Sequence, residues 1–179
     1  AGSSTLSNVA AGVGLSIGGS STGTSTIGVK GALTGTADSF GISFDNATAV
    51  DAVPTLANVA VNSVVLNGVE TVSIASTGVA NSWNSIGLTD SKLQTLNITG
   101  DKNLDLSFVG AGLNGTNTAV GAGGAVKLID GSAATGKLSI NTTNVTADDK
   151  AGVGLTVNGG SAADTITLAQ KATVVAGAG

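Results

Sequence analysis

Short runs in which apolar and polar residues alternate recur along most of the chain. Alternation with a period of two residues indicates a β-strand with one buried face. Turns rich in Gly, Asn and Asp separate the runs, and these residues supply the backbone conformations that tight corners need. The pattern therefore predicts an all-β protein. The runs that show the alternation best are residues 15–17, 40–44, 72–74, 96–98, 104–108, 126–128, 138–140, 153–157 and 166–168.

The predicted strands follow one another at irregular intervals, with small side chains and frequent Gly. This arrangement favours a β-solenoid, in which similar coils stack and the loops between strands vary in length. One or two β-sandwich domains are the alternative, because they also give short strands separated by turns. Residues 47–65, which contain Pro54, follow neither pattern, and we expect an irregular connection there with at most one helical turn.

The composition supports a folded chain with an unusual core. Hydrophobic residues make up 41% of the chain and charged residues only 10%, a balance that argues against disorder. The chain has 28 Gly but only three Phe and one Trp, so large side chains that could anchor a dense globular core are scarce. Because Cys is absent, disulfides cannot contribute to stability, and burial along a repetitive core together with bound ions must supply it.

The missing residue types exclude several kinds of chemistry. Without Cys or His, thiol and imidazole catalysis are impossible, and zinc and copper lack their preferred ligands. Hard cations that bind oxygen, calcium above all, remain compatible with the chain. Glu70 is the sole glutamate, and the chain has no G-x-S-x-G elbow for a nucleophilic serine. We therefore expect the protein not to be an enzyme.

The charge and hydropathy of the chain limit the kinds of partner that it can bind. The net charge is −4 and no basic cluster is present, which argues against nucleic acid as a partner. No apolar run is long enough for a transmembrane helix, and the first residues do not form a Sec signal peptide. The chain lacks an initiating Met and ends in a sequence that resembles the interior of a repeat, so we expect a fragment of a longer protein.

The strongest candidate for a metal site lies near the C-terminus. The sequence from Gly159 and Gly160 to Asp164 approximates the GGxGxDxUx nonapeptide, in which a glycine turn exposes carbonyl oxygens and an Asp completes a calcium shell. Ala162 replaces the third Gly, which weakens the expected corner. The alternative interpretation is an ordinary glycine turn followed by the start of a strand.

A second candidate calcium site combines Asp101 and Asp105, with Asn103 between them. Alternate positions on an extended segment could direct their oxygens toward one cation. The alternative is that Lys102 and solvent satisfy these carboxylates. Asp130 in an Asp-Gly turn and the pair Asp148 and Asp149 are less specific.

Four segments in the second part of the chain resemble the calcium-dependent surface-layer (S-layer) proteins of Gram-negative bacteria, of the Caulobacter and Campylobacter type, and the related type I secreted RTX adhesins. These segments are NGVETVSI, LQTLNITGD, GSAATGKL and the nonapeptide, at residues 67–74, 93–101, 131–138 and 159–167. Their order, rather than any one of them, carries the resemblance. It covers residues 64–179, whereas residues 1–63 form an N-terminal β segment of unassigned type.

The resemblance implies a right-handed parallel β-solenoid with calcium in its turns. It further implies type I secretion and self-assembly of identical copies into a lattice on the bacterial cell surface. A cell-surface polysaccharide is a further candidate partner. The alternative function is a repeat segment of an RTX adhesin, and a carbohydrate-active β-helix enzyme is a more distant third.

Overall fold

The computed structural model describes residues 2–45, 59–78, 83–109, 126–145, 154–168 and 171–179. These residues form fourteen β-strands and no helix, which confirms the all-β prediction. Nowhere in these segments is there a helix of the length and apolar character that a membrane span requires.

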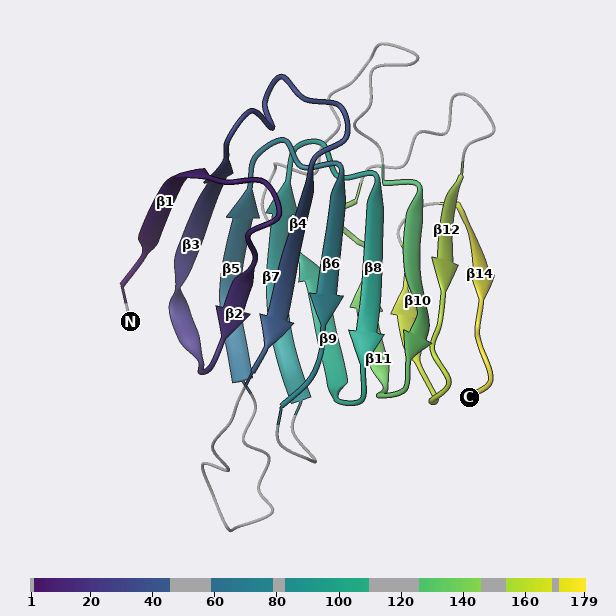
Figure 1. Cartoon of the computed structure of the whole chain (residues 1–179). Helices are drawn as coiled ribbons and strands as arrows, with labels where there is room; N and C mark the ends of the chain where they lie inside the picture. Colours follow the sequence, from purple (N-terminus) through teal and green to yellow (C-terminus); the bar gives the residue numbers. More distant parts are fainter. Residues whose placement is uncertain (1, 46–58, 79–82, 110–125, 146–153, 169–170) are drawn as a thin grey trace.

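The strands are divided equally between two parallel sheets (Figure 1). The odd sheet contains, in spatial order, β1 (Ser4–Val9), β3 (Ser21–Val29), β5 (Val59–Leu66), β7 (Trp83–Asp90), β9 (Asn103–Phe108), β11 (Leu138–Asn141) and β13 (Thr165–Thr167). The even sheet contains β2 (Leu15–Ile17), β4 (Ser39–Phe44), β6 (Thr71–Ala75), β8 (Thr95–Gly100), β10 (Leu128–Ala134), β12 (Leu155–Asn158) and β14 (Ala172–Val175).

The chain alternates between the sheets, so each strand pairs in parallel with the strand two positions along. We call an odd strand and the even strand that follows it a strand pair. Successive strand pairs stack side by side, and the two ends of the chain lie at opposite ends of the stack (Figure 1). This topology is consistent with a β-solenoid. It does not fit the β-sandwich alternative, whose sheets are antiparallel.

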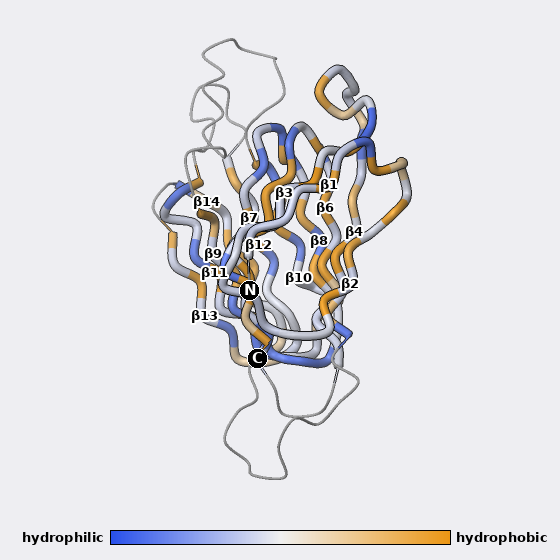
Figure 2. Tube along the Cα trace, turned by 90° about the vertical axis from the view of Figure 1, so that its left-hand side faces the viewer, coloured by the Kyte–Doolittle hydropathy of each residue, from blue (hydrophilic) through white to orange (hydrophobic). Residues whose placement is uncertain are grey.

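The core lies between the two sheets, because alternate residues of each strand point inward. In β4, for example, Phe40, Ile42 and Phe44 are buried and the residues between them are not. Figure 2 shows β9, β11 and β13 on one side of this core and β4, β6 and β8 on the other. In-register pairing aligns the inward side chains in apolar rows. The even sheet has the row Phe40, Val72, Leu96, Ile129, Val157 and Val174.

The odd sheet carries a matching row of Val61, Ile86, Leu106, Ile140 and Ile166. Each fully buried Val, Leu or Ile contributes about 1.5–3 kcal/mol relative to exposure, and the row repeats that contribution at every strand pair. Small residues therefore suffice for the core, which explains how the chain folds with so few aromatic side chains.

Bulges distinguish the first part of the odd sheet from the rest. The pairing register shifts between β1 and β3, between β3 and β5, and between β5 and β7, whereas β7, β9, β11 and β13 pair without a shift. In β5 the extra residue falls between Val61 and Val64, opposite a single Gly87 in β7. An inserted residue reverses the side-chain alternation beyond it.

The expectation of an irregular connection over 47–65 is wrong for residues 59–65, which form most of β5. Val59 and Val61 are buried before the bulge, and Val64 and Leu66 after it. Because the bulge lies between these two pairs, the segment has no continuous two-residue period. Residues 47–58 lie outside the described part of the chain, as do Asp148 and Asp149.

The boundary that we expected between residues 63 and 64 falls inside β5. Strands from both sides of this boundary belong to the same two sheets. The outermost strands, β1 and β2 at one end and β13 and β14 at the other, each have one neighbour in the described structure.

Candidate functional site

The predicted calcium ligands Gly159, Gly160 and Asp164 lie together in the connection from β12 to β13. The Asp164 carboxylate turns back over the glycines, and its Oδ2 accepts a hydrogen bond from the Gly160 N–H at 2.7 Å. A side chain on Gly159 would collide with this oxygen, since a Cβ there would lie 2.6 Å from it. Glycine is therefore required for the carboxylate to approach the turn.

The second oxygen of Asp164 links two strand pairs. Its Oδ1 accepts a hydrogen bond from the Leu138 N–H at 2.8 Å, at the start of β11. Both oxygens are thus used to cap backbone N–H groups. A carboxylate has about four lone-pair positions, so each oxygen keeps capacity for another ligand. The donor types suit calcium, but the calcium assignment stays a prediction.

The second predicted site is arranged differently. Asp101 is exposed in the connection from β8 to β9, and its Oδ2 lies 2.6 Å from the Lys102 Nζ. The hydrogen bond from Lys102 lowers the pKa of Asp101. Asp105 is exposed in the middle of β9, and the Asn103 Oδ1 accepts a hydrogen bond from the Lys137 N–H at 2.9 Å. Asp101 is thus paired with Lys102, as the alternative interpretation expects, and Asn103 binds the backbone of Lys137.

Asp130, the less specific candidate, also acts as a cap. Its Oδ1 accepts hydrogen bonds from the Ser132 N–H at 3.1 Å and from the Asn158 Nδ2 at 3.2 Å. The Ser132 side chain and backbone lower the pKa of Asp130. In the described segments, no three or more His, Cys, Asp or Glu side chains form a group that could hold a metal ion. Any calcium bound there would need backbone carbonyl oxygens in its shell.

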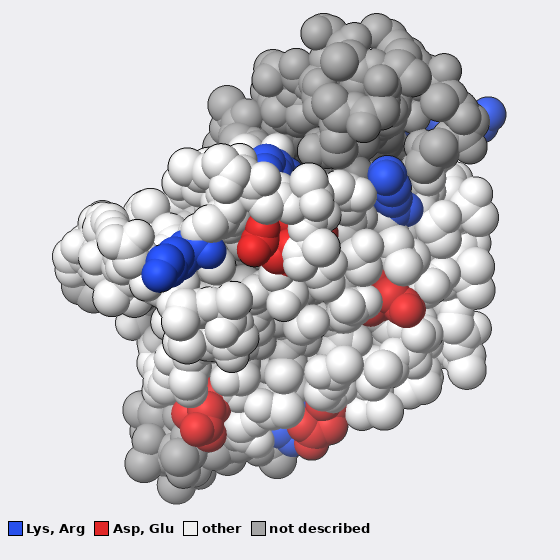
Figure 3. Space-filling model, turned by 45° about the horizontal axis from the view of Figure 1, so that its top comes forward, with Lys and Arg blue, Asp and Glu red and all other residues white. Residues whose placement is uncertain are grey.

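Sequence reasoning missed a polar cluster at the opposite ends of the strands, where the odd strands lead into the even ones. We call Glu70, Asp90, Lys92 and the carbonyl groups of residues 32, 33 and 35 the Lys92 cluster. Its members come from three consecutive connections, β3 to β4, β5 to β6 and β7 to β8. Glu70 and Asp90 are buried, with 5% and 0% of their surface exposed. Uncharged residues cover most of the described surface on the face shown in Figure 3.

Asp90 occupies a position that belongs to the core. It ends β7 in register with Leu66 and, one strand further, with Ile27, both fully buried. Its Oδ1 accepts hydrogen bonds from the N–H groups of Gly68 at 3.2 Å, Val69 at 3.3 Å and Lys92 at 3.0 Å. Its Oδ2 is buried without a hydrogen-bond partner among the described residues. One oxygen of Asp90 thus organises two turns.

Burial changes the acidity of Asp90. Desolvation raises its pKa from the ordinary 3.8 to about 7, against the opposing effect of the three N–H donors, and the charge of nearby Glu70 adds to the rise. Asp90 is therefore largely protonated in mildly acidic solution. The sequence contained a signal for this residue, because the alternation of Ile86 and Leu88 continues to Asp90 and directs a carboxyl group inward.

Lys92 is the cationic member of the cluster. Its Nζ donates hydrogen bonds to the backbone oxygens of Ala32 at 3.1 Å, Leu33 at 2.9 Å and Gly35 at 2.9 Å. The Glu70 Oε1 lies 3.7 Å from the same nitrogen. The Glu70 Oε2 accepts a hydrogen bond from the Asp38 N–H at 2.8 Å, so Glu70 also holds the residue that precedes β4.

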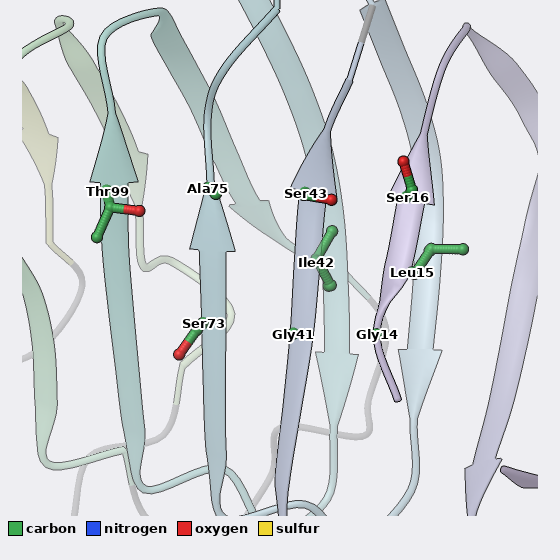
Figure 4. A pocket seen from close by; sticks show the side chains of 9 residues that line it. All are labelled: Gly14, Leu15, Ser16, Gly41, Ile42, Ser43, Ser73, Ala75 and Thr99. Atoms are coloured by element: carbon green, nitrogen blue, oxygen red, sulfur yellow. The ribbon is translucent and has the colours of Figure 1, made fainter. Parts of the chain in front are cut away.

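A shallow groove of about 410 Å³ lies on β2, β4, β6 and β8 (Figure 4). The side chains of Ser16, Ser43 and Thr99 place hydroxyl groups along it, and Gly14 and Gly41 leave the backbone open. None of the nine lining residues is ionisable. The groove therefore offers hydrogen bonds and apolar contact, without groups for acid–base chemistry.

No family model, curated protein or solved structure matches this chain.

Proposed function

We propose that the chain is a structural segment of a bacterial surface protein and that it acts as a subunit of a calcium-dependent S-layer, assembling with identical copies on the cell surface. The observation that carries this proposal is the continuous stack of strand pairs, in which the apolar rows extend to the last described strands, β13 and β14. A stack of this kind has no intrinsic length, since each strand pair contacts only its neighbours.

In this proposal the stack is a right-handed parallel β-solenoid. The course of the chain in Figure 1 supports this handedness. The even strands run downward in front and the odd strands upward behind, while the chain advances from left to right. Right-handed crossovers between parallel strands are also the strongly preferred form in proteins.

The outermost described strands expose apolar side chains. Leu6 of β1 is 52% exposed, and Val174 and Val175 of β14 are 42% and 54% exposed. Val174 belongs to the apolar row of the even sheet, and its exposure follows from the lack of a further strand beside it in the described structure. Edges with exposed apolar side chains favour the addition of another strand, from adjoining sequence or from a second copy.

Calcium fits the Asp164 turn in chemical type. The carboxylate of Asp164 and the carbonyl groups of Gly159 and Gly160 are oxygen donors, which calcium prefers. Asp101 and Asp105 are the next candidates, through their exposed carboxylates. Calcium at the Asp164 turn would neutralise a carboxylate that already connects β11 with the β12 to β13 turn.

Electron microscopy and light scattering of the purified protein, with calcium or with a chelator, test the proposal. Ordered arrays that form with calcium and disperse with the chelator are the expected result. A protein that stays monomeric at high concentration in saturating calcium would contradict the lattice function. If that monomer binds to polysaccharide-coated surfaces, the adhesin alternative replaces the lattice.

A further inference from the structure

The Lys92 side chain ends in a shell of oxygen atoms that has the form of a cation site. Three backbone oxygens surround the Nζ at 2.9–3.1 Å, and the Glu70 carboxylate lies at 3.7 Å. An ammonium group has three N–H donors, and each of them has a carbonyl acceptor here. The side chain of Lys92 is 27% exposed and that of Glu70 only 7%, so solvent screens the pair only partly.

The backbone is shaped to present these oxygens. Gly31 and Gly68 have positive φ angles of 84° and 88°. A Cβ on Gly68 would lie 2.9 Å from the Ala32 oxygen, so only glycine lets the turn before β6 approach the segment that carries the shell. The Asp90 Oδ1 holds the Lys92 N–H at 3.0 Å and thereby fixes the base of the lysine side chain.

We propose that the carbonyl oxygens of Ala32, Leu33 and Gly35, with the Glu70 carboxylate, form a site for a monovalent ammonium-class cation, and that the Lys92 ammonium is its tethered occupant. Two observations select this class. The nitrogen to oxygen distances match N–H···O hydrogen bonds and exceed the 2.3–2.6 Å of calcium to oxygen. A single carboxylate balances one positive charge, whereas calcium sites usually gather more.

The site joins three consecutive connections with one charge. Lys92 lies after β7, Glu70 before β6, and the three carbonyl groups between β3 and β4. A tethered cation cannot be removed by a chelator. One consequence rests on the proposed function, in which calcium binds at the Asp164 turn. A chelator should then loosen the C-terminal strand pairs and leave these three connections intact.

The experiment removes the Lys92 ammonium group by mutation and then adds free cations to the solution. Replacing Lys92→Ala should lower the Tm by about 5 °C, since the three carbonyl groups and Glu70 lose their partner. Adding n-propylammonium chloride should restore much of this loss. Tetramethylammonium chloride at the same ionic strength should not, because it has no N–H donors, and calcium chloride should not because its preferred distances are shorter.

Lys127→Ala is the matched control, because the Nζ of the exposed Lys127 donates to the Gln94 Oε1 at 3.1 Å and, among the described residues, lies in no carbonyl shell of the kind around Lys92. Its Tm should respond to both ammonium salts as the wild type does. An equal response of Lys92→Ala and Lys127→Ala to n-propylammonium, or an equal effect of the two salts on Lys92→Ala, would overturn the proposal.

A measurement on the wild type keeps the proposal testable if Lys92→Ala does not fold. Limited acetylation followed by mass spectrometry compares the reactivity of individual lysines. Lys92 should react several times more slowly than Lys127, because three backbone oxygens accept hydrogen bonds from its nitrogen and its side chain is only 27% exposed. Equal rates would overturn the proposal. A missing calcium response with successful n-propylammonium rescue would instead reject the proposed function alone.

Discussion

Asp90 and Asp164 cap backbone N–H groups of glycine-containing turns at opposite ends of the strands. Both connect two strand pairs, since Asp90 binds the turn before β6 and Asp164 binds the start of β11. Their surroundings differ. Asp90 is fully buried with three donors on one oxygen and none on the other, whereas Asp164 is half-buried with one backbone donor on each oxygen.

The comparison shows that burial and the distribution of donors determine what a capping carboxylate can do. Desolvation raises the pKa of Asp90 to about 7, and no exposed oxygen remains for a ligand. Asp164 keeps lone pairs near the surface, which suits an exchangeable cation. At the Asp90 end the positive charge comes from Lys92, which is part of the chain. At one end of the strands a lysine of the chain supplies the positive charge, whereas at the other end a carboxylate keeps capacity for a cation from solution.

The largest expected effect is a dependence on pH that Asp90→Asn removes. Because the folded-state pKa of Asp90 is raised, its contribution is fully present below the ordinary value of 3.8 and is lost as the pH rises through about 7. The free energy of unfolding of the wild type should therefore fall relative to Asp90→Asn, by about 4 kcal/mol between pH 4 and pH 8. Urea denaturation across this range measures it.

Asp101→Asn is the control for this pH dependence, because Lys102 lowers the pKa of that exposed carboxylate. A lowered pKa gives stability that is lost as the pH falls, so the stability of the wild type should not fall relative to Asp101→Asn as the pH rises. A constant difference between wild type and Asp90→Asn would show that Asp90 titrates alike in the folded and unfolded chain.

The next effect separates the two caps directly. At pH 5, Asp90→Ala should lower the free energy of unfolding by about 3 kcal/mol or more, because it leaves three backbone N–H groups without their acceptor. Asp164→Ala removes two such bonds at a half-buried position and should cost about 1–2 kcal/mol. Equal losses in urea denaturation would remove the basis of the comparison.

Calcium should stabilise the protein through the Asp164 end of the strands and not through the Asp90 end. If calcium binds at Asp164, the folded protein gains about 2.7 kcal/mol when the free ion is a hundredfold above its Kd. Asp164→Asn keeps the shape but removes the charge, and it should reduce this gain. Thermal melts with calcium or a chelator measure the effect. An identical response of wild type and Asp164→Asn would place any bound ion elsewhere, with Asp101 and Asp105 next to be tested.

The smallest effect concerns the turn beneath Lys92. Gly68→Ala combines a positive φ of 88° with a Cβ only 2.9 Å from the Ala32 oxygen, and it should cost about 1–2 kcal/mol. Gly41→Ala is the matched control, since a Cβ there meets nothing within 4 Å. Its effect on the urea midpoint should be close to zero. A Gly68→Ala protein as stable as Gly41→Ala would mean that the shell does not depend on this approach.

Most of the strands that the sequence did not predict lie where the pairing register shifts. Unbulged strands such as β4, β6, β8 and β9 keep their period of two and were predicted with nearly their observed bounds. The strands β1, β3, β5 and β7 were missed, and register shifts occur among these four. The strand β14 was also missed, although it pairs without a shift, and β10, whose pairing with β8 does shift, was predicted only at its start. β3 is also rich in Ser, Thr and Gly, so it has little apolar pattern to detect.

The candidate sites follow the same logic. Gly159, Gly160 and Asp164 are close in sequence, so one motif was enough to expect them in one turn. The Lys92 cluster combines residues 32–35 with Glu70 and with Asp90 and Lys92. These residues meet only because parallel pairing stacks three connections, and no local pattern contains that information. Asp90 alone left a trace, as a carboxyl group in an inward position of an alternating run.

The position of the two ends of the chain has a mechanical consequence. Because they lie at opposite ends of the stack, a pull between them acts across the strands and loads the hydrogen bonds between one strand pair and the next (Figure 1). Strand pairs that contact only their neighbours would peel off in sequence, each at modest force, and the whole would extend gradually instead of breaking at once. Lys92 and Glu70 fasten three connections together. Separation of the strand pairs would therefore stop at these three connections until a higher force is reached.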